Sequence, residues 1–330
     1  MAQKTLAEVL HKKPGHLIRR LQTLAARLFL EEADALDTTF DQFCVLTSVV
    51  AAPGTDQLGI TSATGFDRST VSGVLTRLEG KKLISRATDE NDRRAKVIRP
   101  TASGLALYRK LVICADRADA RMLDVLPTRE RTGFAAMLAR VVRDTNEASR
   151  VPMARSNPDT SLTAALHSRP LYLMRRLQQF AVTVFLEETD GYDITPVQFG
   201  ALVSVLACPG IDQITLSQTI GFDRNTLSGV LERLELKGLI TREPSPADRR
   251  AKVLYLTAAG DALYETLFEA TERSNERMLH GLDHAERDIL VTLMERIVWS
   301  HFEQGGQSVD ASSDEKAAPR RTSVSPPDSA

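Results

Sequence analysis

The segment FDRSTVSGVLTRLE (66–79) returns almost unchanged as FDRNTLSGVLERLE (222–235), at an offset of 222 − 66 = 156 residues. The same offset carries PGHLIRRLQTLAARLFLEE (14–32) onto PLYLMRRLQQFAVTVFLEE (170–188), and DRRAKV at Asp92 onto DRRAKV at Asp248. The alignment of these segments needs no insertion or deletion. Solenoid repeats are much shorter and usually number three or more. The chain is therefore a duplication of one whole domain.

The composition is that of a globular protein of about two domains, with 330 residues of which 42% are hydrophobic and 26% charged. No apolar run approaches the roughly 18 residues that a membrane-spanning helix needs. The first residues, MAQKTLAEVLHKK, lack the continuous apolar segment of a secretory signal. We therefore expect a cytoplasmic protein that makes no contact with a membrane.

The repeat divides the chain into four expected segments: a first module (1–147), a linker (148–165), a second module (166–303) and a tail (304–330). Proline, asparagine and small polar residues interrupt helical periodicity in the linker. The tail has few apolar groups to offset the cost of ordering it, so we expect it to be disordered.

Helical periodicity dominates each module. In the first, leucines at spacings of three and four predict a buried stripe on a helix that begins at Pro14, and further helices are expected over 40–51 and 58–64. Asp67 is a suitable N-cap for the next helix, whose outward face is small and polar. Two β-type segments then flank the charged stretch TDENDRRAK, and helical character resumes over 101–113 and 129–146.

Both modules resemble the MarR family of winged-helix transcriptional regulators. The resemblance is carried by GFDRxTxSGVLxRLExKGLI followed by DxRxxxxxLTxxG, which the second module matches closely. It implies a mainly α fold with small β-hairpin wings, two winged helix-turn-helix domains packed as an intramolecular pseudo-dimer. The first module departs at Lys82, where the second has Gly238, and at Pro100, where it has Leu256. Because proline lacks the backbone N–H, Pro100 suggests a strand edge or a shortened wing.

The resemblance further implies that helix 67–79 enters the major groove of double-stranded DNA and that hairpin 92–96 touches the minor groove. Residues 67–99 hold nine Lys/Arg and five Asp/Glu (9 − 5 = +4), and 223–255 hold seven and five (7 − 5 = +2), although the whole chain has a net charge of −1. Positive charge is thus concentrated where phosphates would bind. The alternative is a solvated basic hairpin tip.

The DNA-contacting residues expected from this resemblance lie at matched positions in the two modules. In the wings, Asp92 and Asp248 would orient Arg94 and Arg250, while the neighbouring cations would contact phosphates. The full set is Arg68, Ser69, Thr70, Ser72, Arg77, Asp92, Arg93, Arg94 and Lys96 in the first module, and Arg224, Asn225, Thr226, Ser228, Arg233, Asp248, Arg249, Arg250 and Lys252 in the second.

The two expected reading helices are not identical, because Asn225 stands where the first module has Ser69. Asparagine can bond bidentately to adenine, which serine cannot. We therefore expect a pseudo-palindromic operator with unequal half-sites. A linker of about 18 residues can reach about 25 Å as a flexible coil, which favours a monomeric pseudo-dimer with readers about 34 Å apart. The alternative is an assembly of two chains that exchange modules.

Many MarR-like regulators release DNA when a small aromatic carboxylate binds, and a His and an Arg near an apolar cleft would suit such an anion. The candidate ligand-binding residues are His11, His16, Arg19 and Arg20, with their counterparts His167, Tyr172, Arg175 and Arg176. The alternative is that they are interface charges satisfied within the helix bundle.

Other site types have weaker support in the sequence. Cys44, Cys114 and Cys208 form no CxxC pair and do not align with one another, so buried structural cysteines are favoured over a redox switch, a disulfide framework or a zinc site. The six histidines show no HExxH or HxH spacing, and we expect neither an enzyme nor a metal or cofactor. The sequence predicts a DNA-binding regulator that a ligand releases from DNA, and not an enzyme. A repressor is favoured over an activator or over an interaction module with weakened DNA binding.

Overall fold

The computed structural model describes residues 10, 12–88, 96–148, 165–222, 224–245 and 252–310. The expected linker, apart from its two end residues, and the tail from residue 311 lie outside this range. So do His11 and the tips of both wings.

The repeat in the sequence is reproduced element by element. The first module contains α1 (Pro14–Glu32), η2 (Asp34–Leu36), α2 (Phe40–Ala51), α3 (Gln57–Thr64), α4 (Arg68–Gly80), β1 (Ile84–Thr88), β2 (Lys96–Pro100), α5 (Ala102–Met122) and α6 (Thr128–Ala148). The second contains α8 (Pro170–Glu188), α9 (Pro196–Ala207), β3 (Ile211–Asp212), α10 (Gln213–Ile220), α11 (Arg224–Leu236), β4 (Ile240–Pro244), β5 (Lys252–Leu256), α12 (Ala258–Met278) and α13 (His284–Asp310). Apart from η2 and β3, each element of the first module begins 156 residues before its counterpart.

Local sequence signals set several of these boundaries. Pro14 and Pro170 lie in the first turns of α1 and α8, where no intrahelical N–H is required. The Asp67 side chain accepts a hydrogen bond from the backbone N–H of Thr70 and so caps α4. The helix after the wing is longer than expected: α5 continues beyond Ile113 to Met122, because small residues there are buried against the core.

The last helix also differs from expectation. Helix α13 continues to Asp310, so the segment 304–310 is helical, whereas the sequence predicted a disordered tail from residue 304. Extending an existing helix adds one hydrogen bond per residue without a new nucleation cost, so polar residues and glycines need not end it.

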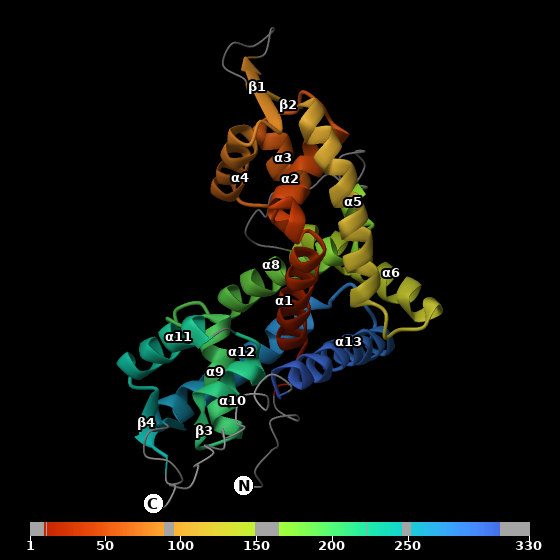
Figure 1. Cartoon of the computed structure of the whole chain (residues 1–330). Coiled ribbons are helices and arrows are strands. Elements are labelled where there is room, and N and C mark those ends of the chain that lie inside the picture. The colour runs from red at the N-terminus through yellow and green to blue at the C-terminus, as the bar shows by residue number, and fades with distance from the viewer. Residues whose placement is uncertain are drawn as a thin grey trace, which may run out of the picture.

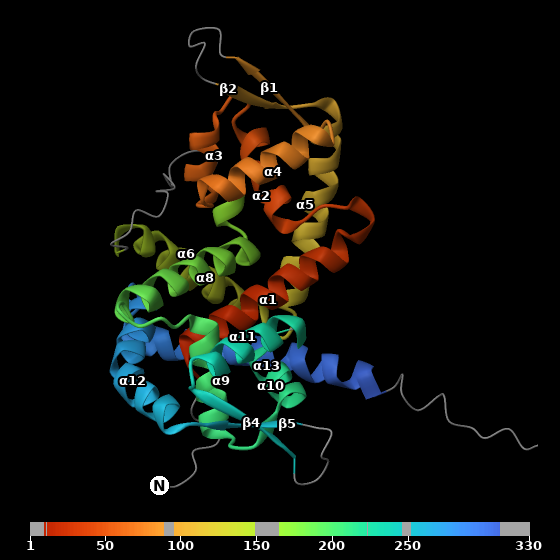
Figure 2. The ribbon, with the colours of Figure 1, turned by 90° about the vertical axis from the view of Figure 1, so that its left-hand side faces the viewer.

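The two winged domains lie at opposite ends of the molecule, with a body of long helices between them (Figures 1 and 2). In Figure 1, α4 and α11 both lie on the left-hand side of the molecule, one in the upper domain and one in the lower. Helix α1 packs against α8 and α13, and α6 packs against α8. The body therefore joins the modules along their first and last helices.

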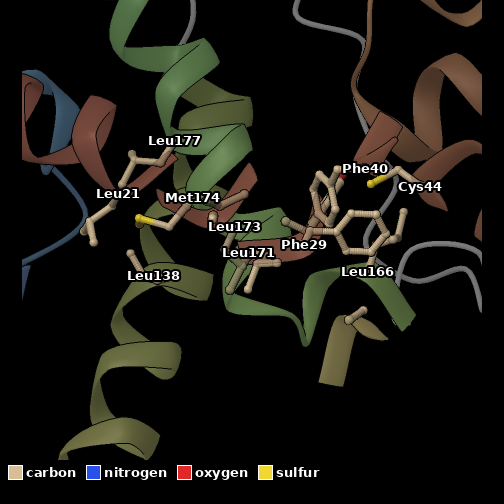
Figure 3. Packing of buried hydrophobic residues seen from close by; sticks show 14 of the residues in the cluster. Leu21, Phe29, Phe40, Cys44, Leu138, Leu166, Leu171, Leu173, Met174 and Leu177 are labelled. Atoms are coloured by element: carbon tan, nitrogen blue, oxygen red, sulfur yellow. The ribbon is translucent and has the colours of Figure 1, made fainter. Parts of the chain in front are cut away.

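One hydrophobic core runs through both modules. It includes Leu17 and Leu21 of α1, Leu138 of α6, Leu177 of α8 and Met294 of α13, all fully buried. Figure 3 shows Leu21 beside Leu177 and Met174, with Leu138 below them. Burial of a large aliphatic side chain contributes about 1.5–3 kcal/mol. The two modules are thus stabilised by a common core.

The interface between the modules repeats its own contacts. Arg140 pairs with Glu286, and the equivalent Arg296 pairs with Glu130 at 2.6 Å. This reciprocity, in which a patch meets its own copy, characterises the interface of a two-fold symmetric dimer. Here both halves of the interface belong to one chain.

The wings show how the proline at position 100 is accommodated. Strand β2 pairs antiparallel with β1 over five residues, and Pro100 lies opposite Ile84 at the end of the strand. The corresponding strand β5 has the same length. Among the described residues the first wing is therefore not shortened, because Pro100 ends a strand of a two-stranded sheet and its missing N–H interrupts no central ladder.

Candidate nucleic-acid interface and ligand cavity

Helix α4 begins in a hydrogen-bonded cap. The Asp67 carboxylate accepts from the hydroxyls of Ser69 and Thr70, and from the backbone N–H of Thr70 at 2.8 Å. These hydrogen bonds hold the pKa of Asp67 well below its usual range. The cap therefore keeps a negative charge at the helix N-terminus and orients two hydroxyls that were predicted to contact DNA.

Helices α4 and α11, which are the expected reading helices, each bury one face and expose the other. Val71, Val74, Leu75 and Leu78 are buried in the core, as expected from their spacing. The predicted DNA-contacting side chains lie opposite: Arg68, Ser69, Arg77, Arg224, Asn225, Thr226 and Arg233 are exposed, while Thr70, Ser72 and Ser228 are half-buried. Each reader thus presents cationic and hydroxyl or amide groups to the surrounding solvent.

A glutamine that sequence reasoning missed fixes the entry of each reading helix. The Gln57 side-chain amide donates to the backbone oxygen of Arg68 at 3.1 Å, and Gln213 donates to that of Arg224 at 3.5 Å. The bond ties the first helix of each helix-turn-helix to the second. Its signal in the sequence is a polar residue retained at the 156-residue offset directly after an N-capping aspartate, Asp56 or Asp212.

The wings are attached to the readers by matched ion pairs. Arg86 of β1 lies 3.3 Å from Glu79 of α4, and Arg242 of β4 lies 3.0 Å from Glu235 of α11. Lys96 and Lys252, at the starts of the returning strands, are exposed. The remaining wing residues predicted to contact DNA, Asp92, Arg93, Arg94, Asp248, Arg249 and Arg250, lie outside the described residues.

A cavity of about 170 Å³ lies between α1 of the first module and α8, α9 and α12 of the second. We call it the second-module cavity. Its walls combine aromatic and aliphatic side chains with polar groups that come from α1, α8 and α12. The lining residues include His16 and Arg19 of α1, Gly200 of α9 and Asn275 of α12.

Arg19 carries the positive charge at this cavity. Its guanidinium lies over the ring of Phe222, 4.5 Å from the centroid, and its Nη2 is 3.3 Å from Nδ1 of His16. Burial, aided by the neighbouring charge of Arg20, lowers the pKa of Arg19 to about 9. The group remains protonated at neutral pH, so a cation faces an apolar space.

Symmetry relates this cavity to a first-module site, which consists of Asp41, Phe43, Asp119, Tyr172 and Arg175. Here Tyr172 takes the position of His16 and is fully buried. Its hydroxyl donates to the backbone oxygens of Ala63 and Thr64, at 3.2 Å each. Arg175, the counterpart of Arg19, lies over Phe66 and pairs with Asp41 at 3.0 Å.

The second arginine of each pair contacts the turn before a reading helix. Arg176 is 1% exposed and donates through Nη1 to the backbone oxygen of Gly65 at 2.9 Å. Its counterpart Arg20 donates to the backbone oxygens of Gln218 and Thr219, at 3.1 and 2.6 Å. Each module thus supplies an arginine that holds its neighbour's helix-turn-helix.

The candidate ligand residues that the structure describes therefore separate into two groups, those at the cavity and those engaged elsewhere. His16 and Arg19 meet at the second-module cavity. Tyr172, Arg175 and Arg176 are engaged in contacts between the modules, and the ring of His167 lies 5.3 Å from that of Tyr172. Burial lowers the pKa of His167 to about 4, so its imidazole is neutral at pH 7. Arg20 bonds to backbone oxygens of the other module, which agrees with the alternative that these residues are interface charges satisfied within the helix bundle.

The three cysteines are separate thiols. Cys44 and Cys114 are buried, and burial raises the pKa of both. Cys208 is half-buried. A raised pKa keeps a thiol protonated and therefore poorly reactive.

Comparison with known proteins agrees with the fold and the helix-turn-helix geometry. The model of the MarR family matches residues 36–95 and 192–251, once in each module. A Thauera aromatica protein described as a transcriptional regulatory protein for the hcr operon is 34% identical over 120 residues, which cover 36% of this chain and 70% of that protein. The chain belongs to the MarR family. It is a winged-helix DNA-binding transcriptional regulator with two MarR modules in tandem.

Other MarR-type relatives match one module's length of this chain. The transcriptional regulator HosA of Escherichia coli O111:H- is 27% identical, over 41% of this chain and 98% of HosA. The transcriptional repressor NicR of Pseudomonas putida is also 27% identical, over 41% of this chain and 85% of NicR. A solved structure of Bordetella bronchiseptica BpsR, described with 6-hydroxynicotinic acid regulating its DNA binding, is 29% identical with a TM-score of 0.38, covering 39% of this chain and 92% of BpsR. In the described part of the chain, every helix is too short or too polar to cross a lipid bilayer.

Proposed function

We propose that this chain is a repressor that binds one operator with both of its reading helices and leaves it when a small anionic aromatic ligand binds. The observation that carries the proposal is the placement of α4 and α11, which expose matched faces on the same side of one joined body (Figure 1). A helix with exposed arginine, hydroxyl and amide groups suits the major groove. The relative NicR is named a repressor, which supports that direction of regulation.

The DNA contacts divide by chemistry. Asn225, where the first reader has Ser69, gives the second reader a bidentate partner for adenine. The wing cations Lys96 and Lys252 are exposed and suit phosphates, which supply affinity without reading sequence. We therefore propose a pseudo-palindromic operator whose two half-sites are read unequally.

The contacts between the two modules support a monomeric protein in which the modules take the place of the two subunits of a dimer. The shared core and the reciprocal pairs Arg140–Glu286 and Arg296–Glu130 satisfy within one chain the interface that would otherwise join two. Sedimentation of dilute protein tests this directly. A species of 36.3 kDa is expected, and one of twice that mass would favour exchange of modules between chains.

Ligand release is supported by the second-module cavity. A cavity of about 150 Å³ can hold a benzene ring, and this one has about 170 Å³ with aromatic walls. Arg19 supplies a cation that can bond a carboxylate with both nitrogens. A thermal-shift screen with benzoate and hydroxybenzoates should raise the unfolding temperature, since a ligand of the folded state stabilises it.

The regulator is tested by mobility shift with DNA from upstream of its own gene. The variants Arg94→Ala and Arg250→Ala should each weaken binding and reduce the salt dependence by about one counterion. Surface Arg129→Ala, on α6, serves as a control far from the readers. Binding that is absent or insensitive to salt would contradict the proposal and favour an interaction module. A reporter whose expression falls on deletion of the gene would indicate an activator.

A further inference from the structure

The two symmetry-related sites differ in the space that they leave for a ligand. The second-module cavity has His16 and Gly200 in its wall, whereas the first-module site has Tyr172 and Cys44 at these positions. The Tyr172 ring is fully buried, and its hydroxyl bonds the last turn of α3. An aromatic side chain of the protein thus fills the first site.

The two sites also differ in charge. In the first, Asp41 pairs with Arg175 at 3.0 Å, and Asp119 accepts from Arg169 at 3.3 Å and from the backbone N–H of Leu171 at 2.9 Å. At the equivalent positions the second module has Val197 in place of Asp41 and Asn275 in place of Asp119. The first site therefore contains carboxylates of its own beside its arginines.

The loss of these carboxylates leaves Arg19 without an ionic partner. Within the described ranges, Arg19 forms no salt bridge, and its Nη1 is a buried donor without an acceptor. A buried guanidinium nitrogen that lacks an acceptor is costly, and an anion that reaches Nη1 removes this cost. Lys13, also at the cavity, is already paired with Glu272 at 2.7 Å. Arg19 is thus the group that a ligand carboxylate would meet.

We propose that the chain binds one ligand, in the second-module cavity, because Tyr172 and Asp41 occupy the first-module site in place of the ring and carboxylate of a ligand. The proposal rests on the ligand-released function proposed above and specifies its stoichiometry and place. It also predicts that the ligand acts differently on the two reading helices, α4 and α11. Tyr172 and Arg176 together hold the turn before α4, whereas the ligand enters beside the turn before α11, which Arg20 holds.

Isothermal titration of the full chain with benzoate and the three hydroxybenzoates tests the proposal, with Arg19→Gln and its matched control Arg175→Gln. We expect a stoichiometry of one per chain, a loss of affinity of about tenfold or more for Arg19→Gln, and unchanged affinity for Arg175→Gln. Circular dichroism melting of each variant confirms that it is folded.

If Arg19→Gln fails to fold, a second variant tests the proposal by giving the second-module cavity the tyrosine of the first-module site. His16→Tyr should fill the cavity, abolish titration and retain DNA binding. Two ligands per chain, or equal losses for Arg19→Gln and Arg175→Gln, would overturn the inference and leave ligand release intact. If none of the four acids binds the wild-type chain, both the ligand-released function and this inference are refuted, while operator binding is judged separately by the mobility shift.

Discussion

The glycine before each reading helix gives a matched pair of substitutions. Gly65 and Gly221 end α3 and α10 with φ values of +64° and +70°, in the left-handed region. A methyl group at position 65 would lie 1.4 Å from Nη1 of Arg176, whereas one at position 221 would have no atom nearer than 3.8 Å, on Arg20. The same chemical change therefore meets a buried guanidinium in one module and only an ordinary van der Waals contact in the other.

The expected cost can be worked out in two steps. Alanine in the left-handed region costs about 1–2 kcal/mol, from which about 0.4–1 kcal/mol is recovered through the unfolded chain. Gly221→Ala should therefore lower the free energy of unfolding by about 1 kcal/mol. Gly65→Ala must in addition displace Arg176 from its 2.9 Å bond to the oxygen of Gly65. Losing a hydrogen bond to a buried charge costs about 1.5–3 kcal/mol, for a total of about 3 kcal/mol.

Urea unfolding followed by circular dichroism measures both free energies in the full chain. Binding to duplexes that carry only one half-site of the operator adds a functional readout, in which Gly65→Ala should weaken the first reader more than the second. Equal destabilisation by Gly65→Ala and Gly221→Ala would refute the reasoning, because the guanidinium contact would then contribute nothing to holding the turn.

Further predictions concern the helix end at position 82 and the buried carboxyl at position 119. Lys82 has φ +57° where Gly238 has φ +66°, so Lys82→Gly should raise the free energy of unfolding by about 0.5–1 kcal/mol and Gly238→Lys should lower it, with thermal midpoints moving in opposite directions. Two shifts of the same sign would contradict this. Burial raises the pKa of Asp119 from 3.8 to about 6, so the folded state binds its proton more tightly than the unfolded state. Its contribution to stability is therefore present below pH 4 and lost as the pH rises through 6, and Asp119→Asn, which copies Asn275, should gain stability over the wild type across that interval. A difference that does not vary with pH would disprove the assigned cause.

Local signals allowed much of the fold to be predicted. The 156-residue offset alone gives the correspondence of the two modules, and the buried spacing of Val71, Val74, Leu75 and Leu78 gives the exposed face of α4. A helix whose buried face is made largely of alanine has a weak hydrophobic pattern. The sequence therefore does not predict the second half of α5, where Ala115, Ala118 and Met122 are buried.

The difference between the two ligand sites could be noticed in the sequence but not interpreted. His16 and Tyr172 align, yet nothing local to Tyr172 indicates that its hydroxyl meets Ala63, which lies 109 residues earlier. Likewise, Arg20 and Arg176 resemble ligand-binding groups in sequence, but the folded chain commits them to backbone oxygens of the opposite module. Such assignments depend on how helices approach one another, which residue spacing does not encode.

The reciprocal interface within one polypeptide has a further consequence for orientation on DNA. A symmetric homodimer turned end for end is the same object, so its direction along an operator has no meaning. In this chain Tyr172 fills the first-module site, whereas the second-module cavity is open, so the two ends of the protein are distinguishable after such a turn. An operator with unequal half-sites can therefore seat the protein in one direction, and the same ligand would then loosen the half-site on one chosen flank of the promoter.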